Sequence, residues 1–261
     1  MEGSRSYGVG LARVLSAAGL LVIECEQPGR KQRRGMGKSD PIDAHLAVLA
    51  ALRLDAGRLP VPRADGDREA LRILLCARQE IAVACTAQGN RLRALLLAGD
   101  DADRRAARQA LGKTALAALA GRELPARARR DQAVRQSEIR RLAAALSQAR
   151  QQLKDNRAQL LAIIDDLAPG LISRYGIGPV SAAQAIVSFS HPGRCRSEAA
   201  FAALSGTSPI PASSGRTIRH RLNRGGDRAL NRTILTDVAA RVGDDPPLVA
   251  EQAREGAARG A

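Results

Sequence analysis

The sequence predicts a mainly helical protein with a small α/β part near its amino terminus. Two long stretches, residues 67–97 and 139–167, repeat apolar residues at helical spacing. One short apolar run, residues 20–25, is typical of a strand covered on both faces in a parallel sheet. With 261 residues, 45% of them hydrophobic, the chain can bury a core and form one large domain or two or three small ones.

The first sixty residues contain one predicted strand between two predicted helices. Residues 7–19 place apolar side chains on one helical face and end at Gly19. The strand 20–25 and a basic loop follow, and Asp40 and Pro41 open a helix that runs to about Leu54. A buried strand needs neighbours for its backbone groups, and this region offers no second strand. We therefore expect its partners to come from elsewhere or to be missing.

The middle of the chain predicts long helices that pack through an apolar seam. Residues 60–66 are a linker by their Pro and Gly content. In 139–167 the seam residues are spaced alternately three and four apart, as in a coiled coil, and the polar Asn156 can fix the register. The seam comprises Ile139, Leu142, Leu146, Ala149, Leu153, Asn156, Leu160, Ile163 and Leu167. An antiparallel helix pair within one chain and a dimer both fit this pattern.

These features divide the chain into consecutive regions. The predicted divisions are an amino-terminal domain 1–59, the linker 60–66, a helical region 67–168, a carboxy-terminal domain 169–245 and a tail 246–261. Pro169 and Gly170 close the second long helix, and the sequence after them is rich in small residues and becomes strongly basic.

The charge of the chain indicates a polyanionic partner. Lys and Arg number 41 against 26 Asp and Glu, which gives a net charge of +15 and favours nucleic acid. No apolar run reaches the about 18 residues of a membrane span, and no secretory signal opens the chain, so we expect a cytoplasmic protein without a membrane partner. The cysteines and histidines are too scattered to indicate disulfides or a zinc site. Aromatic residues make up only 2%, which predicts recognition by arginine rather than by base stacking.

Two segments after residue 170 could grip phosphates. Gly176 and Gly178 belong to a glycine turn that opens a helix, similar to the hairpin of helix-hairpin-helix modules, although an ordinary interhelical turn fits equally well. The second segment is a cluster of arginines opposed only by Asp227 and interrupted by a turn. A solvated face is the plainer interpretation, but the lack of acids favours phosphate contact. The cluster comprises Arg216, Arg219, Arg221, Arg224, Arg228 and Arg232.

Two further segments could carry chemistry. Ser213 and Ser214 precede Gly215 beside the arginines, where a serine could attack a phosphodiester, although the same residues are ordinary loop composition. Asp40 and Asp43 would share the first turn of a helix, where they could hold a divalent metal with a third carboxylate. Acidic residues at this position are equally a normal way for a helix to begin.

These residues together resemble the DEDD-type insertion-sequence transposases, the IS116/IS110/IS902 group. The resemblance rests on residues 1–8, on 38–44 with its two aspartates, and on 205–229. It implies a resolvase-type, RNase H-like domain that binds Mg²⁺ through acids, a coiled-coil region, and a carboxy-terminal transposase domain with a nucleophilic serine. Carried over, Glu2, Asp40 and Asp43 would be metal ligands and catalytic residues, and Ser214 the nucleophile, with Ser213 as the alternative.

The resemblance also implies partners and departures. It implies DNA as the substrate, a structured RNA encoded by the element, and a homo-oligomer through 139–167, because DNA ends are usually joined by paired subunits. The family's first aspartate and opening strands have no counterpart, and the basic final helix is replaced by a short tail, so we expect a chain truncated at both ends. An inactive remnant and a misplaced start codon are the two hypotheses. The rival functions are a non-enzymatic dimeric DNA-binding protein, which would grip backbone phosphates, and a coiled-coil interaction protein.

Overall fold

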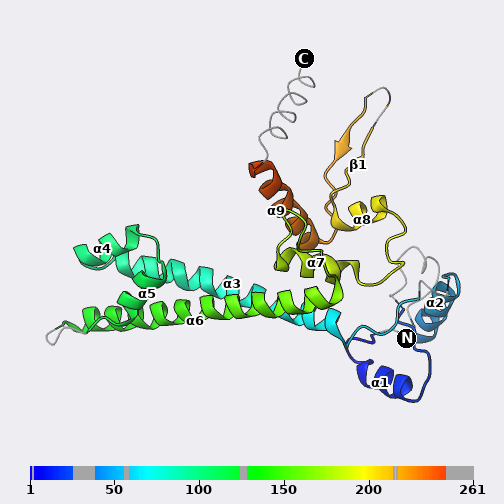
Figure 1. The fold of residues 1–261 in the computed structure, drawn as a ribbon, viewed down its shortest axis with the longest axis horizontal. Coiled ribbons are helices and arrows are strands. Elements are labelled where there is room, and N and C mark those ends of the chain that lie inside the picture. Colours follow the sequence, from blue (N-terminus) through cyan, green and yellow to red (C-terminus); the bar gives the residue numbers. More distant parts are fainter. Residues whose placement is uncertain are drawn as a thin grey trace. The chain divides into compact units, whose positions relative to one another are not determined.

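The structure is a computed structural model that describes residues 1, 3–25, 39–55, 59–123, 128–213, 215 and 217–244, with side chains as far as residue 236. Helices dominate these residues, which confirms the predicted mainly helical class (Figure 1). The elements are α1 (Val9–Ala17), α2 (Asp40–Leu52), α3 (Asp67–Leu97), α4 (Asp101–Arg108), α5 (Lys113–Ala120), α6 (Arg130–Leu167), α7 (Pro179–Phe189), α8 (Glu198–Ser205), β1 (Ile210–Pro211), β2 (His220–Arg221) and α9 (Arg228–Asp244). None of the helices in the described ranges is long and apolar enough to cross a lipid bilayer.

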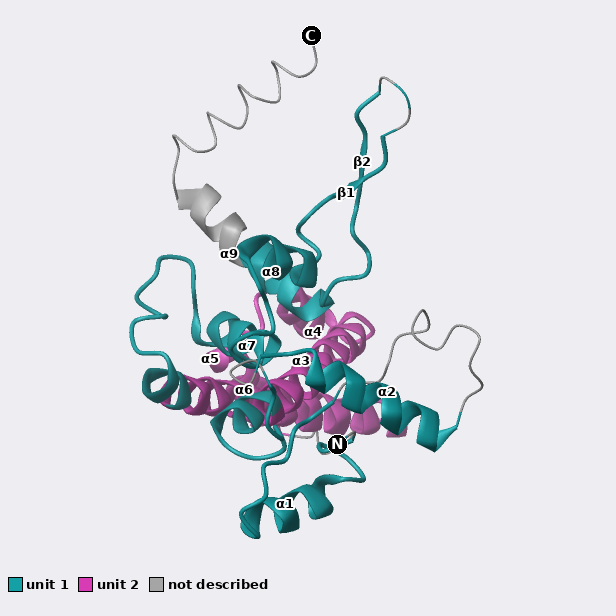
Figure 2. Cartoon of the chain, turned by 90° about the vertical axis from the view of Figure 1, so that its right-hand side faces the viewer, with its two compact units in different colours: residues 1–72, 163–261 teal, residues 73–162 magenta. Residues whose placement is uncertain are grey.

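The chain forms two compact units, which are coloured separately in Figure 2. One unit joins Met1–Arg72 to Ile163–Ala261, and the other is Ile73–Ala162. The first unit therefore brings together the two ends of the sequence, while the second contains most of the two long helices. The predicted domain boundaries remain predictions.

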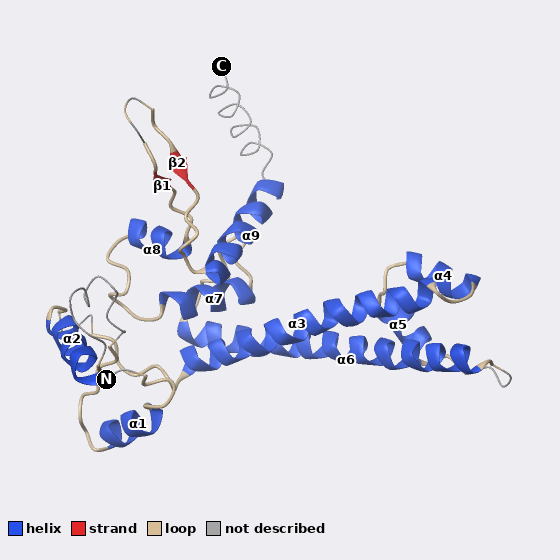
Figure 3. Ribbon diagram, turned by 180° about the vertical axis from the view of Figure 1, so that it is seen from behind, coloured by secondary structure: helices blue, strands red, loops and turns tan. Residues whose placement is uncertain are grey.

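The second unit is built on α3 and α6, which run side by side in opposite directions (Figure 3). Leu92 and Leu96 of α3 are fully buried. On α6, Ile139 is fully buried and Leu142 is 2% exposed. Two polar contacts set the register: the Asn156 amide donates to the Leu74 carbonyl at 2.9 Å, and the Arg78 guanidinium donates to the Leu153 carbonyl at 3.0 Å. The buried Asn156 thus bonds the neighbouring helix of the same chain, as a polar residue that fixes the register of a seam does.

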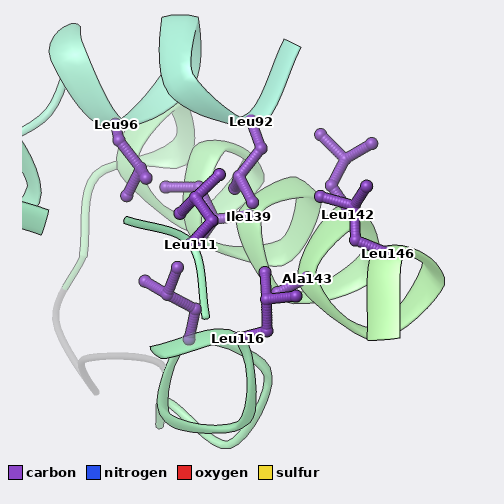
Figure 4. Close-up of a cluster of buried hydrophobic side chains, with 9 residues drawn as sticks. Leu92, Leu96, Leu111, Leu116, Ile139, Leu142, Ala143 and Leu146 are labelled. Carbon is purple, nitrogen blue, oxygen red and sulfur yellow. The ribbon is translucent and has the colours of Figure 1, made fainter. Parts of the chain in front are cut away.

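The short helices α4 and α5 complete this core and were not individually predicted. Leu116 of α5 and Leu111, just before it, lie in the apolar cluster between α3 and α6 (Figure 4). The buried Asp103 carboxylate of α4 accepts hydrogen bonds from Arg122 and, at 3.2 Å, from the Gln136 amide. A buried polar group is costly without hydrogen-bond partners, and the partners of Asp103 tie α4 to α6.

The apolar seam of α6 packs against other helices of the same chain. Its positions from Ile139 to Leu160 are buried or half-buried, which is the antiparallel alternative that the sequence left open. Near the end of α6 the buried position moves by one residue, to Ile164, and Leu167 is 43% exposed. A homo-oligomer through residues 139–167 has no support from these contacts and stays a prediction, as does a coiled coil with a second chain.

The predicted strand over residues 20–25 is wrong. These residues have no regular secondary structure, and their described main-chain hydrogen bonds reach single residues only. The Met1 amino group donates to the Ile23 carbonyl at 2.6 Å, the Cys25 amide to the Met1 carbonyl at 2.8 Å, and the Glu24 amide to the Pro60 carbonyl at 2.7 Å. A strand needs a ladder of bonds that continues along a neighbouring strand, and these bonds do not continue into one among the described residues. Among described residues the one sheet is the pair β1–β2, so the small α/β part and the RNase H-like domain expected near the amino terminus are not confirmed.

The carboxy-terminal part of the first unit packs α8 and the long helix α9 against one another and α9 against α7. Leu230 of α9 and Ala182 and Ala183 of α7 are completely buried. Small residues on α7 let α9 approach closely, which leaves room for the large Leu230 side chain. The hairpin of β1 and β2 leaves this core with both strands exposed.

Two glycines allow the turn before α9 to lie on the end of α8. Gly206, at φ 73°, ends α8 in the left-handed conformation that favours glycine. A Cβ added at Gly226 would lie 2.5 Å from the Cα of Gly206 and closer still to its nitrogen. The Asp227 amide donates to the Leu204 carbonyl at 2.7 Å beside this contact. The close approach of the two backbones therefore fixes where α9 begins.

We expect Gly226→Ala to destabilise this part of the protein and its neighbour Gly225→Ala to be tolerated. A Cβ at Gly225 would meet nothing nearer than the Asn223 Oδ1 at 3.5 Å, which is ordinary contact, whereas the Cβ at Gly226 forces two backbones apart. Overpacking of this kind costs about 1–3 kcal/mol. Urea unfolding followed by circular dichroism would measure both variants, and equal stabilities would contradict the close contact.

Candidate nucleic-acid interface

A basic groove lies beside the end of α8 and the beginning of α9. It encloses about 510 Å³ and is lined by three arginines, two asparagines, two glycines and no acidic residue. Its lining residues are Ser205, Gly206, Leu222, Asn223, Arg224, Gly226, Arg228, Asn231, Arg232 and Leu235. Three members of the predicted arginine cluster therefore meet in one concave surface, where guanidinium and amide groups are the donors that phosphate oxygens accept.

The turn over residues 222–227 contributes to the lining of the groove, and the sequence predicted a turn here. The Asn223 side chain accepts a hydrogen bond from the Gly225 amide at 3.0 Å, and its own amide donates to the Ala203 carbonyl at 3.4 Å. This side-chain turn interrupts the arginine cluster before α9 and holds it against α8. Arg224 thereby projects from the turn, while Arg228 and Arg232 follow one helical turn apart on α9.

Asp227 is the only acid among residues 216–232, and its carboxylate is occupied. It accepts hydrogen bonds from the Ala229 and Leu230 amides at 2.9 and 3.0 Å, which caps α9, and from the Ser188 hydroxyl of α7 at 2.6 Å. Burial alone would raise the pKa of the Asp227 carboxyl, but the bonds from Ser188 and the two amides and the charge of Arg194 outweigh it, so the pKa is lowered. The acid therefore stabilises the helix start and is absent from the groove lining.

Two other predicted arginines lie on the hairpin. Arg219 directly precedes β2 and Arg221 lies within it, both exposed, and neither lines the groove. The Ser213 hydroxyl accepts a hydrogen bond from the Arg219 amide at 3.3 Å, and the Ala212 amide donates to the Arg219 carbonyl at 2.8 Å. Ser213 therefore contributes to the hairpin itself. Ser214 and Arg216 lie outside the described residues.

The glycine turn opens α7, as predicted, but it does not line the groove. Gly178 is the N-cap of α7, Pro179 follows it, and Gly176 has φ 85°, where glycine is favoured. Residues 168–178, between α6 and α7, are turns and bends, so a helix-hairpin-helix module is not confirmed. Phosphate binding by Gly176 and Gly178 stays a prediction.

Sequence reasoning missed a buried ion pair that ties the amino-terminal segment to the end of α7. Glu24 and Arg63 are 7% exposed each and form a salt bridge, and Arg63 also donates to the Ser190 hydroxyl. Burial alone would raise the pKa of Glu24, but hydrogen bonding from Arg63 and the charges of Arg63 and Arg5 outweigh it and lower the pKa. Neither residue belongs to a recognisable motif, so pairing over this sequence distance could not be read from the chain.

The same junction holds a strained turn. Ser190 has φ 72° and ψ −59°, and the His191 amide donates to the Phe189 carbonyl at 2.9 Å, which makes a γ-turn of the rare positive-φ kind. Arg68 donates to the Val187 carbonyl at 2.9 Å, just before this turn. Burial, followed by the charges of Arg63 and Arg5, lowers the pKa of Arg68 to about 10. The junction therefore concentrates positive charge at the end of α7.

The two predicted metal-binding aspartates lie in the first turn of α2. Asp40 is exposed and Asp43 is half-buried, and Ser39 is the N-cap. Within the described residues no cluster of three or more His, Cys, Asp or Glu could hold a metal ion, so the described donors do not by themselves fit Mg²⁺. Glu2 lies outside the described residues. The assignment of Glu2, Asp40 and Asp43 as ligands stays a prediction.

We expect Asp227→Asn to reduce stability at neutral pH by about 1 kcal/mol and to lose this effect in acid. Because the folded-state pKa of Asp227 is lowered, its stabilisation is complete above the unfolded-state value of about 4 and disappears as the pH falls through the folded-state value. Unfolding free energies at pH 7 and at pH 2–3 would test this. The control is Asp101→Asn, because the Asp101 side chain is 85% exposed. An equal pH dependence of stability in both variants would contradict the role assigned to Asp227.

Two family models match different parts of the chain. A family model described as the transposase IS116/IS110/IS902 family matches residues 170–249, which include α7, α8, the hairpin, the groove and α9. A second model, of a DEDD-type transposase, matches residues 1–98. No curated protein matches the chain. The two matches span more than half of the sequence and come from the same group of mobile elements, and the chain therefore belongs to the IS110-type family of insertion-sequence transposases.

Proposed function

We propose that this transposase binds DNA phosphates in the groove beside α8 and α9 and that its hairpin carries the nucleophile that cuts and rejoins the strand. The observation that carries the proposal is the lining of the groove, which gathers Arg224, Arg228 and Arg232 and no acid. The hydrogen bonds of the half-buried Asp227 carboxylate to Ser188 and to the first turn of α9 support it, since the one local acid is held by other partners. Uncompensated arginines in a concave surface favour a polyanion.

The chemical step would use Ser214. Its hydroxyl oxygen would attack a phosphorus atom, the new serine–phosphate bond would form as the bond to one sugar oxygen breaks, and that oxygen would take up a proton equivalent to the one lost by serine. Rejoining reverses the step with a different sugar hydroxyl. The hydrogen bond that engages Ser213 in the hairpin supports Ser214 over its neighbour. Arginines near the hairpin would stabilise the charge on the transferring phosphoryl group.

A divalent metal belongs to the expected activity of a DEDD-type family. The proposed ligands are Asp40 and Asp43 together with Glu2, and the placement of the two aspartates in one helical turn supports this. Because the described carboxylates do not complete a site, we derive no step of the reaction through the metal.

Removing groove arginines should reduce the salt dependence of DNA binding. The double variant Arg228→Gln/Arg232→Gln should lower the slope of log affinity against log salt by about 2 on duplex DNA, because each lost phosphate contact contributes about 0.9. Arg105→Gln, an exposed arginine of α4, is the control and should leave the slope unchanged. Fluorescence anisotropy over a salt series measures this, and equal slopes in all three proteins would refute the groove as the binding surface.

Ser214→Ala should abolish a covalent protein–DNA adduct that the unchanged protein forms. The assay would use duplexes with the element's ends, Mg²⁺ and the element's RNA, followed by denaturing electrophoresis. Ser213→Ala is the matched control, because it removes a hairpin hydrogen bond and leaves the proposed nucleophile. An adduct lost only in Ser213→Ala would reverse the assignment, and DNA binding without an adduct in any protein would leave a binding protein that does not cut.

A further inference from the structure

An apolar pocket lies beside α8 and shares one residue, Ser205, with the basic groove. It encloses about 430 Å³, within the about 300–1,000 Å³ range of pockets that bind small ligands. Its walls come from the end of α7, the loop 195–197, α8 and α9. The lining residues are Phe189, Cys195, Ser197, Glu198, Phe201, Ala202, Ser205, Thr207 and Ile234.

The pocket contains every phenylalanine of the chain. The sequence has two Phe, two Tyr and no Trp, and both Phe side chains line this one cavity. Their ring centroids are 6.5 Å apart with planes inclined at 58°. Phe189 is 40% exposed, which is unusual for a residue placed only to fill a core. An aromatic face that remains accessible is a surface on which a planar ligand can stack.

The pocket adjoins the basic groove. Ser205, at the end of α8, lines both the pocket and the groove. Cys195 of the pocket lies between the exposed Arg194 and Arg196 in the chain. An anionic strand held by the groove arginines would therefore pass beside the mouth of an apolar, aromatic cavity.

We propose that this pocket receives one unstacked nucleobase of the DNA strand whose phosphates bind in the groove. The inference rests on the proposed function of the groove and specifies what the site holds beyond phosphate. A base is flat, apolar on its faces and polar at its edge, which matches a cavity with two phenylalanines and a polar rim. A base that leaves the stack beside the phosphate groove would find an aromatic cavity within reach of its own backbone phosphate.

The rim adds a chemical preference. Glu198 begins α8, is exposed, and presents a carboxylate that can only accept hydrogen bonds. Carboxylates pair with exocyclic amino groups, as Glu does with cytosine N4. Cytosine and adenine carry such a group and thymine does not, so the pocket should favour an amino-bearing base.

The first measurement compares a normal single-stranded DNA with an abasic strand of the same length and charge, by fluorescence anisotropy. The unchanged protein should bind the normal strand about fivefold or more tightly, because base–aromatic stacking contributes at least this factor. Phe189→Leu keeps an apolar side chain and should bring the ratio close to one at an unchanged salt slope. Tyr7→Leu, an aromatic residue 80% exposed outside the pocket, should leave the ratio unaltered.

A second variant, Glu198→Gln, tests the pocket even if Phe189→Leu fails to fold. The unchanged protein should bind cytosine-containing strands more tightly than thymine-containing ones, and Glu198→Gln, on the exposed first turn of α8, should remove this preference. Equal binding of normal and abasic strands, or a ratio unaffected by Phe189→Leu, would overturn the base pocket. A base-dependent ratio found with RNA and not with DNA would overturn the assignment to DNA.

The binding measurements on normal and abasic strands also distinguish the groove proposal from the pocket proposal. Arg228→Gln/Arg232→Gln should weaken binding of normal and abasic strands equally and lower the salt slope, while the ratio between strands persists. Loss of the slope without any base dependence would support the groove and refute the pocket. No change of slope in this variant would refute the groove, whatever the base dependence.

Discussion

The carboxylate of Asp227 is the contact on which the arrangement of the carboxy-terminal site depends. Through Ser188 it reaches α7, through the amides of Ala229 and Leu230 it starts α9, and its own amide bonds the end of α8. Three helices therefore meet at one residue. These hydrogen bonds favour the charged form of the carboxyl, so the pKa of Asp227 is lowered although burial alone would raise it. The basic groove and the apolar pocket both lie beside this junction and share Ser205 of α8.

The positive and negative side chains near this junction have different surroundings. Arginines on the turn and on α9 line a groove without acids, whereas the half-buried acid of the same segment, Asp227, caps the start of α9. A strongly basic protein with evenly mixed charges would attract nucleic acid only weakly and without direction. Concentrating the arginines on one concave face makes the attraction local, and the apolar pocket beside it adds a contact that charge alone cannot provide.

A buried ion pair connects the amino-terminal segment to the carboxy-terminal part of the first unit. Glu24 and Arg63 are brought together although neither lies in a helix or strand, and Arg63 continues to the strained turn at Ser190. An ion pair of this kind is costly to break, since removal of one partner leaves the other charge buried. The region matched by the DEDD-type model and the region matched by the transposase family model are thus connected within one unit.

Much of the helical structure could be predicted from the sequence, because it depends on local periodicity. The long helices α3 and α6 follow from apolar residues at helical spacing, α2 from Asp40 and Pro41, and α7 from the glycine turn before it. The short helices α4 and α5 escaped prediction, since their burial depends on neighbours such as Gln136 and Leu96. The strand over residues 20–25 failed for a related reason: an apolar run indicates burial, but a strand exists only if another strand pairs with it.

The sequence by itself therefore determined the family, the helical class and the presence of an arginine cluster interrupted by a turn. Only the tertiary structure decided which arginines share a groove, that Asp227 bonds α7 and α9 and is absent from the groove lining, and that the α6 seam packs on α3. It also placed Phe189 and Phe201, twelve residues apart, in one pocket beside that groove, where the low aromatic content had argued against base stacking. Periodicity and composition report on local segments, whereas contact between distant residues depends on how the helices pack.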